Sequence, residues 1–149
     1  MAKFVYRMQG ILNVKEKMET QAKNEFAIAS AKLREEEDTL NRFYARLDGY
    51  EAELKELYSR VLDIPKITET QNAVEMMKYQ IRMQMLRVKT AERELEVKRA
   101  ALQEAMLDRK THDKLKEREF EQFLVEVAAA ESKEIDELVS YRFGQDKED

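Results

Sequence analysis

The chain has 149 residues, of which 39% are charged and 43% are hydrophobic, and it carries a net charge of -4, with no cysteine. Abundant charge with little glycine or proline is typical of long helices with a narrow apolar seam rather than of a globular domain. The balance of acidic and basic residues gives no electrostatic reason to bind nucleic acid or an anionic membrane, and no direct membrane insertion is expected. No signal-peptide pattern and no apolar run of about 20 residues is present, so we expect a soluble, cytoplasmic chain.

A first helix is predicted over residues 4–61. Its apolar residues recur in steps of three and four, which is typical of a coiled-coil seam. Two consecutive steps of four, Met18 to Ala22 and Ala22 to Phe26, predict a stutter in this seam. From there the pattern runs regularly to Val61, and only Glu36 interrupts it. The early seam positions are predicted to be Phe4, Met8, Ile11, Lys15, Met18 and Ala22.

A turn is predicted over residues 62–67, because this stretch contains the only proline of the chain, Pro65. Proline lacks the backbone N–H that a helix interior needs, and its ring clashes with the preceding turn. The residue before it, Ile64, is expected to be extended. The sequence therefore predicts that the chain folds back on itself near Pro65.

A second helix is predicted over residues 68–142. Its main apolar stripe recurs every seven residues, and charged residues dominate from Asp108 to Glu119. Residues 143–149 are predicted to form a frayed acidic tail. The stripe consists of Ile67, Val74, Ile81, Val88, Leu95 and Leu102.

The two stripes match one another in an antiparallel arrangement, with Leu40 opposite Val88 and Phe26 opposite Leu102. The sequence therefore predicts an all-α fold, a single long two-helix antiparallel coiled-coil hairpin over residues 1–149 with its turn near Pro65. In this register Glu36 lies near Glu92, an unfavourable pair of like charges. The second helix continues past the start of the first, so its end is predicted to overhang.

No enzymatic chemistry is predicted. The single histidine, His112, lies in a charged segment and is expected to be a solvated surface residue. Runs of carboxylates on a coiled coil are usually a solvated face. The sequence contains no glycine-rich phosphate loop and no metal-ligand spacing, so no catalytic residue, metal or cofactor is predicted.

Two groups of apolar residues exceed what a two-helix seam needs, and such an excess favours partner binding. The group near the turn either binds a partner or broadens the seam, and the overhanging end of the second helix either binds a partner or simply frays. The first group is Met76, Tyr79, Met83 and Leu86 with Tyr44, and the second includes Ile135, Leu138, Val139 and Tyr141.

The chain resembles the flagellar FliJ family. The resemblance begins at Phe4, Met8 and Ile11–Leu12, followed by Lys15–Glu16 and Glu19. The C-terminal part is more similar, with the runs 99–105, 114–118 and 131–139 in the order that the family has them, the last resembling the family's closing segment Glu-Lys-Glu-x-Asp-Glu.

The resemblance implies a component of the flagellar type III protein export apparatus that looks like the central stalk of a rotary ATP synthase. Its implied partners are the export ATPase hexamer, the cytoplasmic domain of the membrane export gate, and export chaperones. It would associate peripherally with the cytoplasmic face of the cell membrane. Alternatives are the equivalent stalk of a virulence-type secretion system and a purely structural coiled-coil scaffold.

Within that role, the tip that carries both termini is predicted to enter the ATPase ring, and the half near the turn is predicted to bind the gate. The gate-binding residues are the near-turn group, Tyr44, Met76, Tyr79, Met83 and Leu86. The ring-binding residues are Phe4, Arg109, Lys110, Lys116, Arg118, Ile135, Leu138 and Tyr141.

Overall fold

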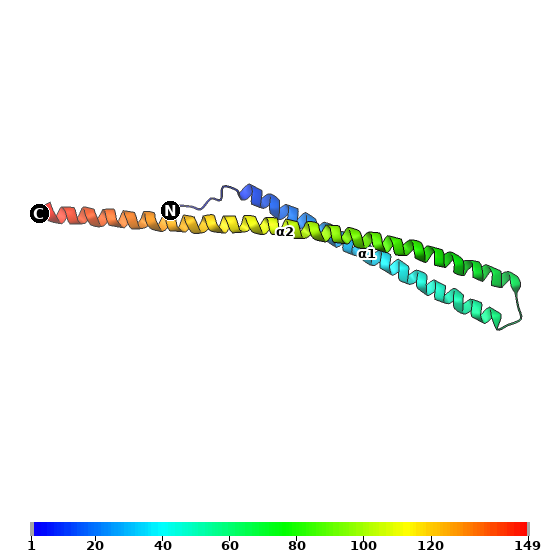
Figure 1. Ribbon diagram of the computed structural model, residues 1–149. Coiled ribbons are helices and arrows are strands. Elements are labelled where there is room, and N and C mark those ends of the chain that lie inside the picture. Colours follow the sequence, from blue (N-terminus) through cyan, green and yellow to red (C-terminus); the bar gives the residue numbers. More distant parts are fainter. Residues whose placement is uncertain (1, 149) are drawn as a thin grey trace. The chain divides into compact units, whose positions relative to one another are not determined.

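The computed structural model describes residues 2–148, which form two long helices and contain no strand (Figure 1). Helix α1 spans Gln9–Tyr58 and helix α2 spans Ile64–Glu148, with 50 and 85 residues. The helices pack against each other in antiparallel directions, so the predicted all-α two-helix hairpin is confirmed. The chain divides into two compact units, which are described in turn: unit 1 is Met1–Thr20 with Glu104–Asp149, and unit 2 is Gln21–Gln103.

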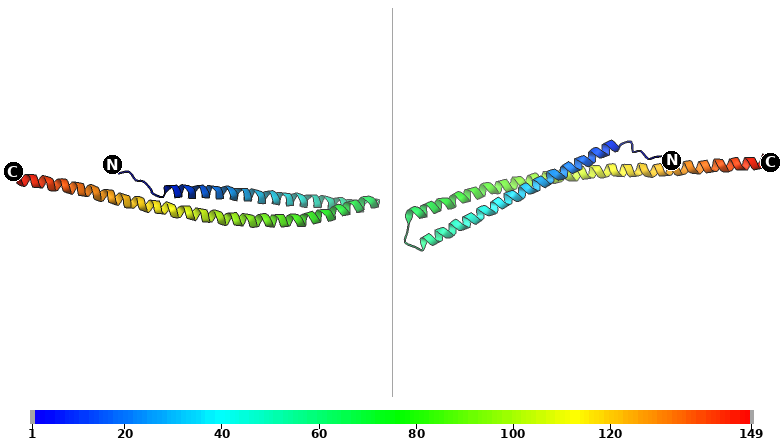
Figure 2. Two further views of the ribbon diagram at one scale, coloured as in Figure 1. Left: turned by 90° about the horizontal axis from the view of Figure 1, so that it is seen from above. Right: turned by 180° about the vertical axis from the view of Figure 1, so that it is seen from behind.

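Unit 2 is an antiparallel pair formed by the later part of α1 and the first part of α2 (Figures 1 and 2). Most of its buried side chains are apolar, and the predicted stripe of α2 points into this seam. The buried apolar residues of unit 2 are Ala29, Ile67, Val74, Met77, Ile81 and Ala91.

The connection between the helices lies at residues 59–63, three residues earlier than its predicted start. The prediction that Pro65 lies in the turn and that Ile64 is extended is wrong, because both belong to the first turn of α2. A proline is tolerated there because the first N–H groups of a helix have no intrahelical acceptor. Asp63 caps this end: its backbone carbonyl accepts from Ile67 N, and its carboxylate accepts from Lys66 N.

The first helix ends at Tyr58 rather than at Val61. Ser59 donates from its backbone N and from its hydroxyl to the Glu56 carbonyl oxygen, at 3.1 and 2.7 Å, which closes the last turn. Val61, the predicted last residue of the seam pattern, is 97% exposed and lies outside the seam. Beside the connection, Gln71 Nε2 donates a hydrogen bond across the helices to the Tyr58 hydroxyl, at 2.7 Å.

The predicted register is wrong in unit 2. Glu36 contacts Gln84 of α2 rather than lying near Glu92, and the Phe26 ring lies under the Arg99 guanidinium, 5.6 Å from the ring centroid, rather than facing Leu102. The direction of this shift follows from the earlier connection, because a fold-back point nearer the N-terminus pairs each α1 residue with an earlier residue of α2.

Unit 1 pairs the start of the chain with the later part of α2. The helix predicted from Phe4 begins only at Gln9, whose backbone N donates to the Tyr6 carbonyl oxygen, and the Met8 carbonyl oxygen accepts from Ile11 N and Leu12 N. The preceding segment is not helical because Phe4 and Tyr6 both face inward. Residues two apart lie on nearly opposite faces of a helix but on the same face of an extended chain.

The seam of α1 keeps its steps of three and four from Met8 to Leu57, so the predicted stutter is absent. Leu12 is 2% exposed and Glu19 is 5% exposed, whereas Ile11 and Met18, the predicted seam residues, are 45% and 50% exposed. The stutter was predicted because the apolar Met18 was preferred to the charged Glu19 as a seam residue. Glu19 can occupy the seam because Arg109 of α2 pairs with its carboxylate.

Helix α2 continues to Glu148, so the frayed tail predicted over residues 143–149 is wrong for its described part, while Asp149 lies outside the described residues. No proline interrupts this stretch, and Gly144 alone weakens a helix by only about 1 kcal/mol relative to alanine. A hydrogen bond from Gln145 Nε2 to the Tyr141 hydroxyl, at 3.1 Å and four residues apart, supports the last turns.

Candidate partner-binding surfaces

The near-turn group forms an exposed apolar stripe on α2 of unit 2, which we call the turn-half surface. Met76, Tyr79, Met83 and Leu86 are 57%, 53%, 46% and 58% exposed, and their spacing of three and four residues places them on one face of the helix. Tyr44 belongs to α1 and is 38% exposed. The stripe therefore lies outside the seam.

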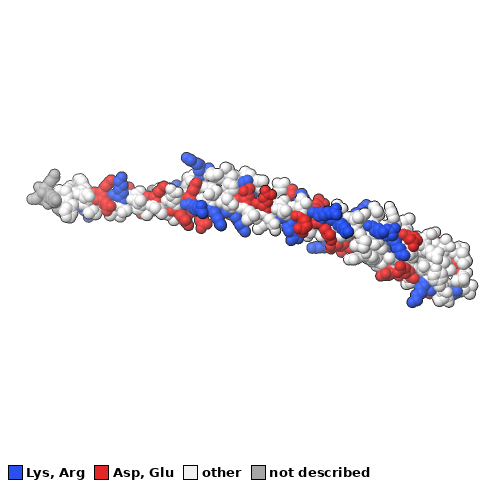
Figure 3. All heavy atoms as spheres, in the orientation of Figure 1, with Lys and Arg blue, Asp and Glu red and all other residues white. Residues whose placement is uncertain are grey.

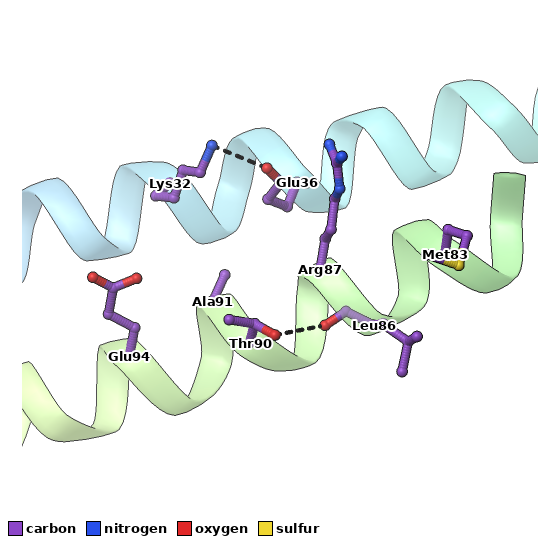
Figure 4. Close-up of a pocket in the computed structure, with 8 residues that line it drawn as sticks. All are labelled: Lys32, Glu36, Met83, Leu86, Arg87, Thr90, Ala91 and Glu94. Carbon is purple, nitrogen blue, oxygen red and sulfur yellow. Dashed lines mark hydrogen bonds and ion pairs between the residues drawn. The ribbon is translucent and has the colours of Figure 1, made fainter.

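Shallow hollows adjoin this stripe on both sides of Met83. One is lined by Phe43, Tyr79, Gln80, Met83, Gln84 and Arg87. The other includes Met83, Leu86 and Arg87 with Lys32 and Glu36 of α1, and in Figure 4 Arg87 extends from α2 toward α1 whereas Leu86 points away. Phe43 and Arg87 are residues that the sequence analysis missed, because neither breaks the coiled-coil pattern.

The turn-half surface is basic as well as apolar. Between Glu75 and Glu92 there is no acidic residue, while Lys78, Arg82, Arg87 and Lys89 lie in this interval. Lys78 Nζ lies 3.8 Å from Glu75 Oε1, and the charge of Arg87 acts on Glu36 of α1, whose pKa it helps to lower after the larger effects of Lys32 and Gln84. Basic and acidic side chains are otherwise mixed along the face shown in Figure 3. The exposed stripe is thus suited to an apolar partner surface with an acidic rim.

A polar cluster in the seam supports this surface from beneath. Lys32 Nζ lies 3.0 Å from Glu36 Oε1, and Gln84 Nε2 donates to the same carboxylate. The hydrogen bond from Lys32, followed by that from Gln84, lowers the pKa of Glu36 below its ordinary value. The Glu36 hydrogen bond in turn raises the pKa of Lys32. Glu36 therefore remains charged although the residue is only 9% exposed.

The predicted ring-binding residues, which we call the terminal surface, belong to unit 1 and do not form one patch. Ile135, Leu138 and Tyr141 are 59%, 63% and 65% exposed, and every residue from 128 to 145 is exposed. This part of α2 has no helix packed on it within unit 1 (Figure 2). Lys110 and Arg118 are exposed, and Lys116 is half-buried.

Phe4 and Arg109 have structural contacts within unit 1. Phe4 is half-buried, and its ring centroid lies 5.1 Å from Phe120 and 5.4 Å from Phe123. Arg109 pairs with Glu19 of α1 and, at 2.5 Å, with Asp113, and these hydrogen bonds raise its pKa further. Both side chains hold the two segments of unit 1 together, so less of each is available to a partner than the sequence suggested.

The seam of unit 1 contains further charged and polar groups. Lys15 Nζ lies 2.8 Å from Asp108 Oδ2, and this hydrogen bond lowers the pKa of Asp108. The expectation that His112 is a solvated surface residue is wrong: it is half-buried, and its Nδ1 is buried without a hydrogen-bond partner in the described part of the chain, as is the Tyr6 hydroxyl. His112 lies in the seam because it follows Arg109 by three residues.

The structure also exposes an apolar stripe on α1 that the sequence analysis assigned partly to the seam. Ile11, Val14 and Met18 share one outward face of α1 in unit 1. The sequence signal was present, since Leu12 fits the seven-residue repeat of the later seam. It was overridden because Met18 is apolar where Glu19 is not, and seven residues before Met18 lies Ile11 rather than Leu12.

Within residues 2–148, no group of histidine and carboxylate side chains is arranged to hold a metal ion. The hollows beside Met83 are shallow and open to solvent. Across the same residues, neither helix has a segment that is both long and apolar enough to cross a membrane.

Comparison with known protein families identifies the chain. Its sequence matches the family described as flagellar FliJ protein over residues 4–148, which includes both helices and both surfaces. The chain belongs to the FliJ family. Membership associates it with the type III export apparatus, as a coiled-coil component of a family that is not catalytic, and it confirms the resemblance seen in the sequence.

Among solved structures, the chain is similar to "a putative YscO homolog CT670 from Chlamydia trachomatis", which is 19% identical; each chain covers 99% of the other, and the TM-score is 0.47. A search of curated proteins finds no match. The assignment to the FliJ family therefore rests on the family match alone.

Proposed function

We propose that this FliJ-family chain is a stalk-like component that links the export ATPase hexamer to the cytoplasmic domain of the membrane export gate. The observation that carries the proposal is the unpaired end of α2, where Ile135, Leu138 and Tyr141 are exposed on a helix without a packing partner in unit 1. An apolar helix end of this kind favours insertion into a protein cavity. The family's association with the export apparatus makes the ATPase ring our choice of cavity.

The basic residues of unit 1 would add electrostatic complementarity to this insertion. Lys110 and Arg118 are exposed and available to acidic groups of a ring. Arg109, which is paired with Glu19 and Asp113, would act by holding α1 against α2. We therefore expect Lys110 and Arg118 to affect the rate of binding, and Ile135 and Leu138 to affect its strength.

The turn-half surface is our candidate for the gate. It offers four apolar side chains that are exposed outside the seam of unit 2, and Arg82 and Arg87 lie in the same part of α2. Tyr44 of α1 would extend the contact. Export chaperones are further partners of the proposed role, and the protein would act without enzymatic activity on the cytoplasmic face of the cell membrane.

The decisive experiment measures ATP hydrolysis by the cognate export ATPase with and without this protein, together with light scattering of the ATPase. We expect stimulation with hexamer formation, and its loss in the double variant Ile135→Lys/Leu138→Lys. Val97→Lys, an exposed apolar residue of α2 in unit 2, is the matched control. No stimulation and no association would overturn the stalk proposal and leave a virulence-type ATPase or a scaffold role to be tested.

The division between the surfaces is tested by the triple variant Met76→Ala/Tyr79→Ala/Met83→Ala. We expect weaker binding to the isolated cytoplasmic domain of the gate, with unchanged stimulation of the ATPase. The exposure of these three side chains means that the variant should fold. Equal loss of gate binding and ATPase stimulation would contradict the division.

A further inference from the structure

The two segments of unit 1 place charges between them and apolar side chains outside. Lys15 and Glu19 of α1 face α2 and pair with Asp108 and Arg109. The outward stripe of Ile11, Val14 and Met18 is 45%, 53% and 50% exposed. In a surface helix that packs only on one neighbour the apolar stripe faces that neighbour, so a second apolar stripe indicates a second packing partner.

The overhanging part of α2, residues 128–142, is a helix without a packing partner in unit 1. Ile135, Leu138 and Val139 are 59%, 63% and 56% exposed, and their spacing of three and four residues gives them one face. An isolated helix is marginal in water and gains most of its stability from packing such a face. Unit 1 therefore contains both an uncovered stripe and an uncovered helix.

The charges of these two parts are opposite. Residues 130–142 contain four acidic and two basic residues. The paired part of unit 1 around the α1 stripe, residues 8–18 and 105–116, contains six basic and three acidic residues. The overhanging segments of two copies would therefore repel each other. The overhanging segment of one copy and the paired part of unit 1 of another copy would attract each other.

We propose that two copies of this chain associate through unit 1, so that residues 128–142 of each copy pack along the Ile11–Val14–Met18 stripe of the other. The contact is reciprocal, and a two-fold axis therefore relates the copies. The occupant of the stripe is thus a second copy of the same chain rather than a different protein.

The positions along α2 are consistent with this two-fold arrangement. Because Lys15 pairs with Asp108 in an antiparallel pair of helices, Val14 lies about level with Arg109. Placing Leu138 of one copy level with Val14 of the other brings Phe123 and Leu124 of the two copies level with each other at the axis. Leu124 is 50% exposed, and its neighbour Val125 is 69% exposed, so apolar side chains are available there too.

This association would cover Ile135 and Leu138, the residues that we assign to the ATPase ring. Binding to a second copy and binding to the ring would then exclude each other, and the dimer would be a reserve form that dissociates when the ring captures one chain. The self-association does not depend on the ring assignment, and it is measured on the isolated protein.

The chain has no cysteine, so single engineered cysteines can test the pairing directly. We would mix a Val14→Cys chain with a Leu138→Cys chain that carries a tag of different mass and add a mild oxidant. Two thiols then form one disulfide, and the oxidant takes up two electrons and two protons. We expect a disulfide-linked species of mixed mass that far exceeds the product of either chain alone. Ile28→Cys, which is 70% exposed on α1 in unit 2, replaces Val14→Cys in the matched control and should give no mixed product.

Sedimentation of the full-length chain over a range of concentrations gives the second measurement. We expect a monomer–dimer equilibrium that weakens by roughly tenfold or more in Val14→Lys and in Leu138→Lys, and that is unchanged in Ile28→Lys. Circular dichroism checks that each variant keeps its helix content. A chain that stays monomeric at the highest concentration reached, or cross-links that form mainly between two Leu138→Cys chains, would overturn the proposal.

Discussion

Gln84 of α2 holds Glu36 of α1 by two hydrogen bonds, from its Nε2 to the backbone carbonyl oxygen at 2.9 Å and to the carboxylate Oε2 at 2.5 Å. The two residues are only 4% and 9% exposed. A buried polar pair fixes the register of two helices, because sliding them would leave a carboxylate without its partners.

Replacing Gln84 by leucine should lower the free energy of unfolding by about 1–3 kcal/mol, since it leaves the buried Glu36 carboxylate with one hydrogen-bond partner fewer. Urea unfolding followed by circular dichroism measures the loss. Gln103→Leu, at an exposed position of the same helix, is the control and should change the stability little. The double variant Glu36→Leu/Gln84→Leu should recover the loss, and a double variant less stable than Gln84→Leu would contradict this account.

The contribution of Glu36 should depend on pH. Its pKa is lowered from 4.5, first by the Lys32 hydrogen bond and then by that from Gln84. The unfolded chain therefore binds the proton at a higher pH than the folded chain does, so the stabilisation is present above pH 4.5 and is lost as the pH falls through the folded pKa. We expect the stability difference between the natural chain and Glu36→Gln to shrink between pH 7 and pH 3 in urea unfolding. An equal difference at both pH values would count against the charge of Glu36.

Two adjacent residues test the position of the α1 seam. Leu12→Ala removes a side chain that is 2% exposed and should destabilise unit 1 by about 2–3 kcal/mol, at the low end for a buried leucine because the site lies near a helix start. Ile11→Ala changes an outward side chain and should cost no more than about 0.5 kcal/mol. Hydrogen exchange of the backbone amides of residues 9–20 measures both. A larger effect of Ile11 would restore the stutter that the sequence predicted.

The start of α2 gives a second pair of variants. Asp63→Ala removes the carboxylate that accepts from Lys66 N and should cost about 0.5–2 kcal/mol. Pro65→Ala breaks no hydrogen bond and should change the stability by less than about 1 kcal/mol, mainly through the unfolded chain. Thermal unfolding compares them directly, and a dominant effect of Pro65 would mean that the proline, rather than the cap, determines where the helix begins.

Phe4 should hold the first residues of the chain against α2. Phe4→Ala loses two ring contacts with Phe120 and Phe123 and should weaken this attachment by about 1 kcal/mol. Trypsin cleavage after Lys3 and Arg7 should become faster, at unchanged overall helix content. Val5→Ala, at a residue that is 78% exposed, is the control and should not change the cleavage rate.

The sequence predicted the two helices, their antiparallel pairing and the exposed stripe of Met76, Tyr79, Met83 and Leu86, because these depend on apolar spacing alone. It misplaced the start of α2 and the seam of unit 1, because both depend on polar partners. Asp63 caps α2 ahead of Pro65, and Glu19 enters the seam because Arg109 neutralises it. Such pairs join residues far apart in the chain, and periodicity within one helix does not reveal them.

The candidate surfaces were predictable to the same extent. The exposed apolar residues were predicted because a two-helix seam does not need them. The structural contacts of Phe4 and Arg109 were not predicted, since an aromatic or basic residue in a sequence gives no sign of its partner. The outward stripe of Ile11, Val14 and Met18 emerged only when the burial of Leu12 was known.

The fold-back at residues 59–63 implies an order of assembly. Cross-helix contacts join residues 13 positions apart at Tyr58–Gln71, 48 apart at Glu36–Gln84, 73 apart at Glu25–Lys98 and 90 apart at Glu19–Arg109. Short loops close with the least loss of chain entropy, so helix pairing should start beside the connection and extend stepwise toward the termini. During synthesis on the ribosome, the residues that emerge first would be the last to pack, because Phe4 packs only after Phe120 and Phe123 have been synthesised.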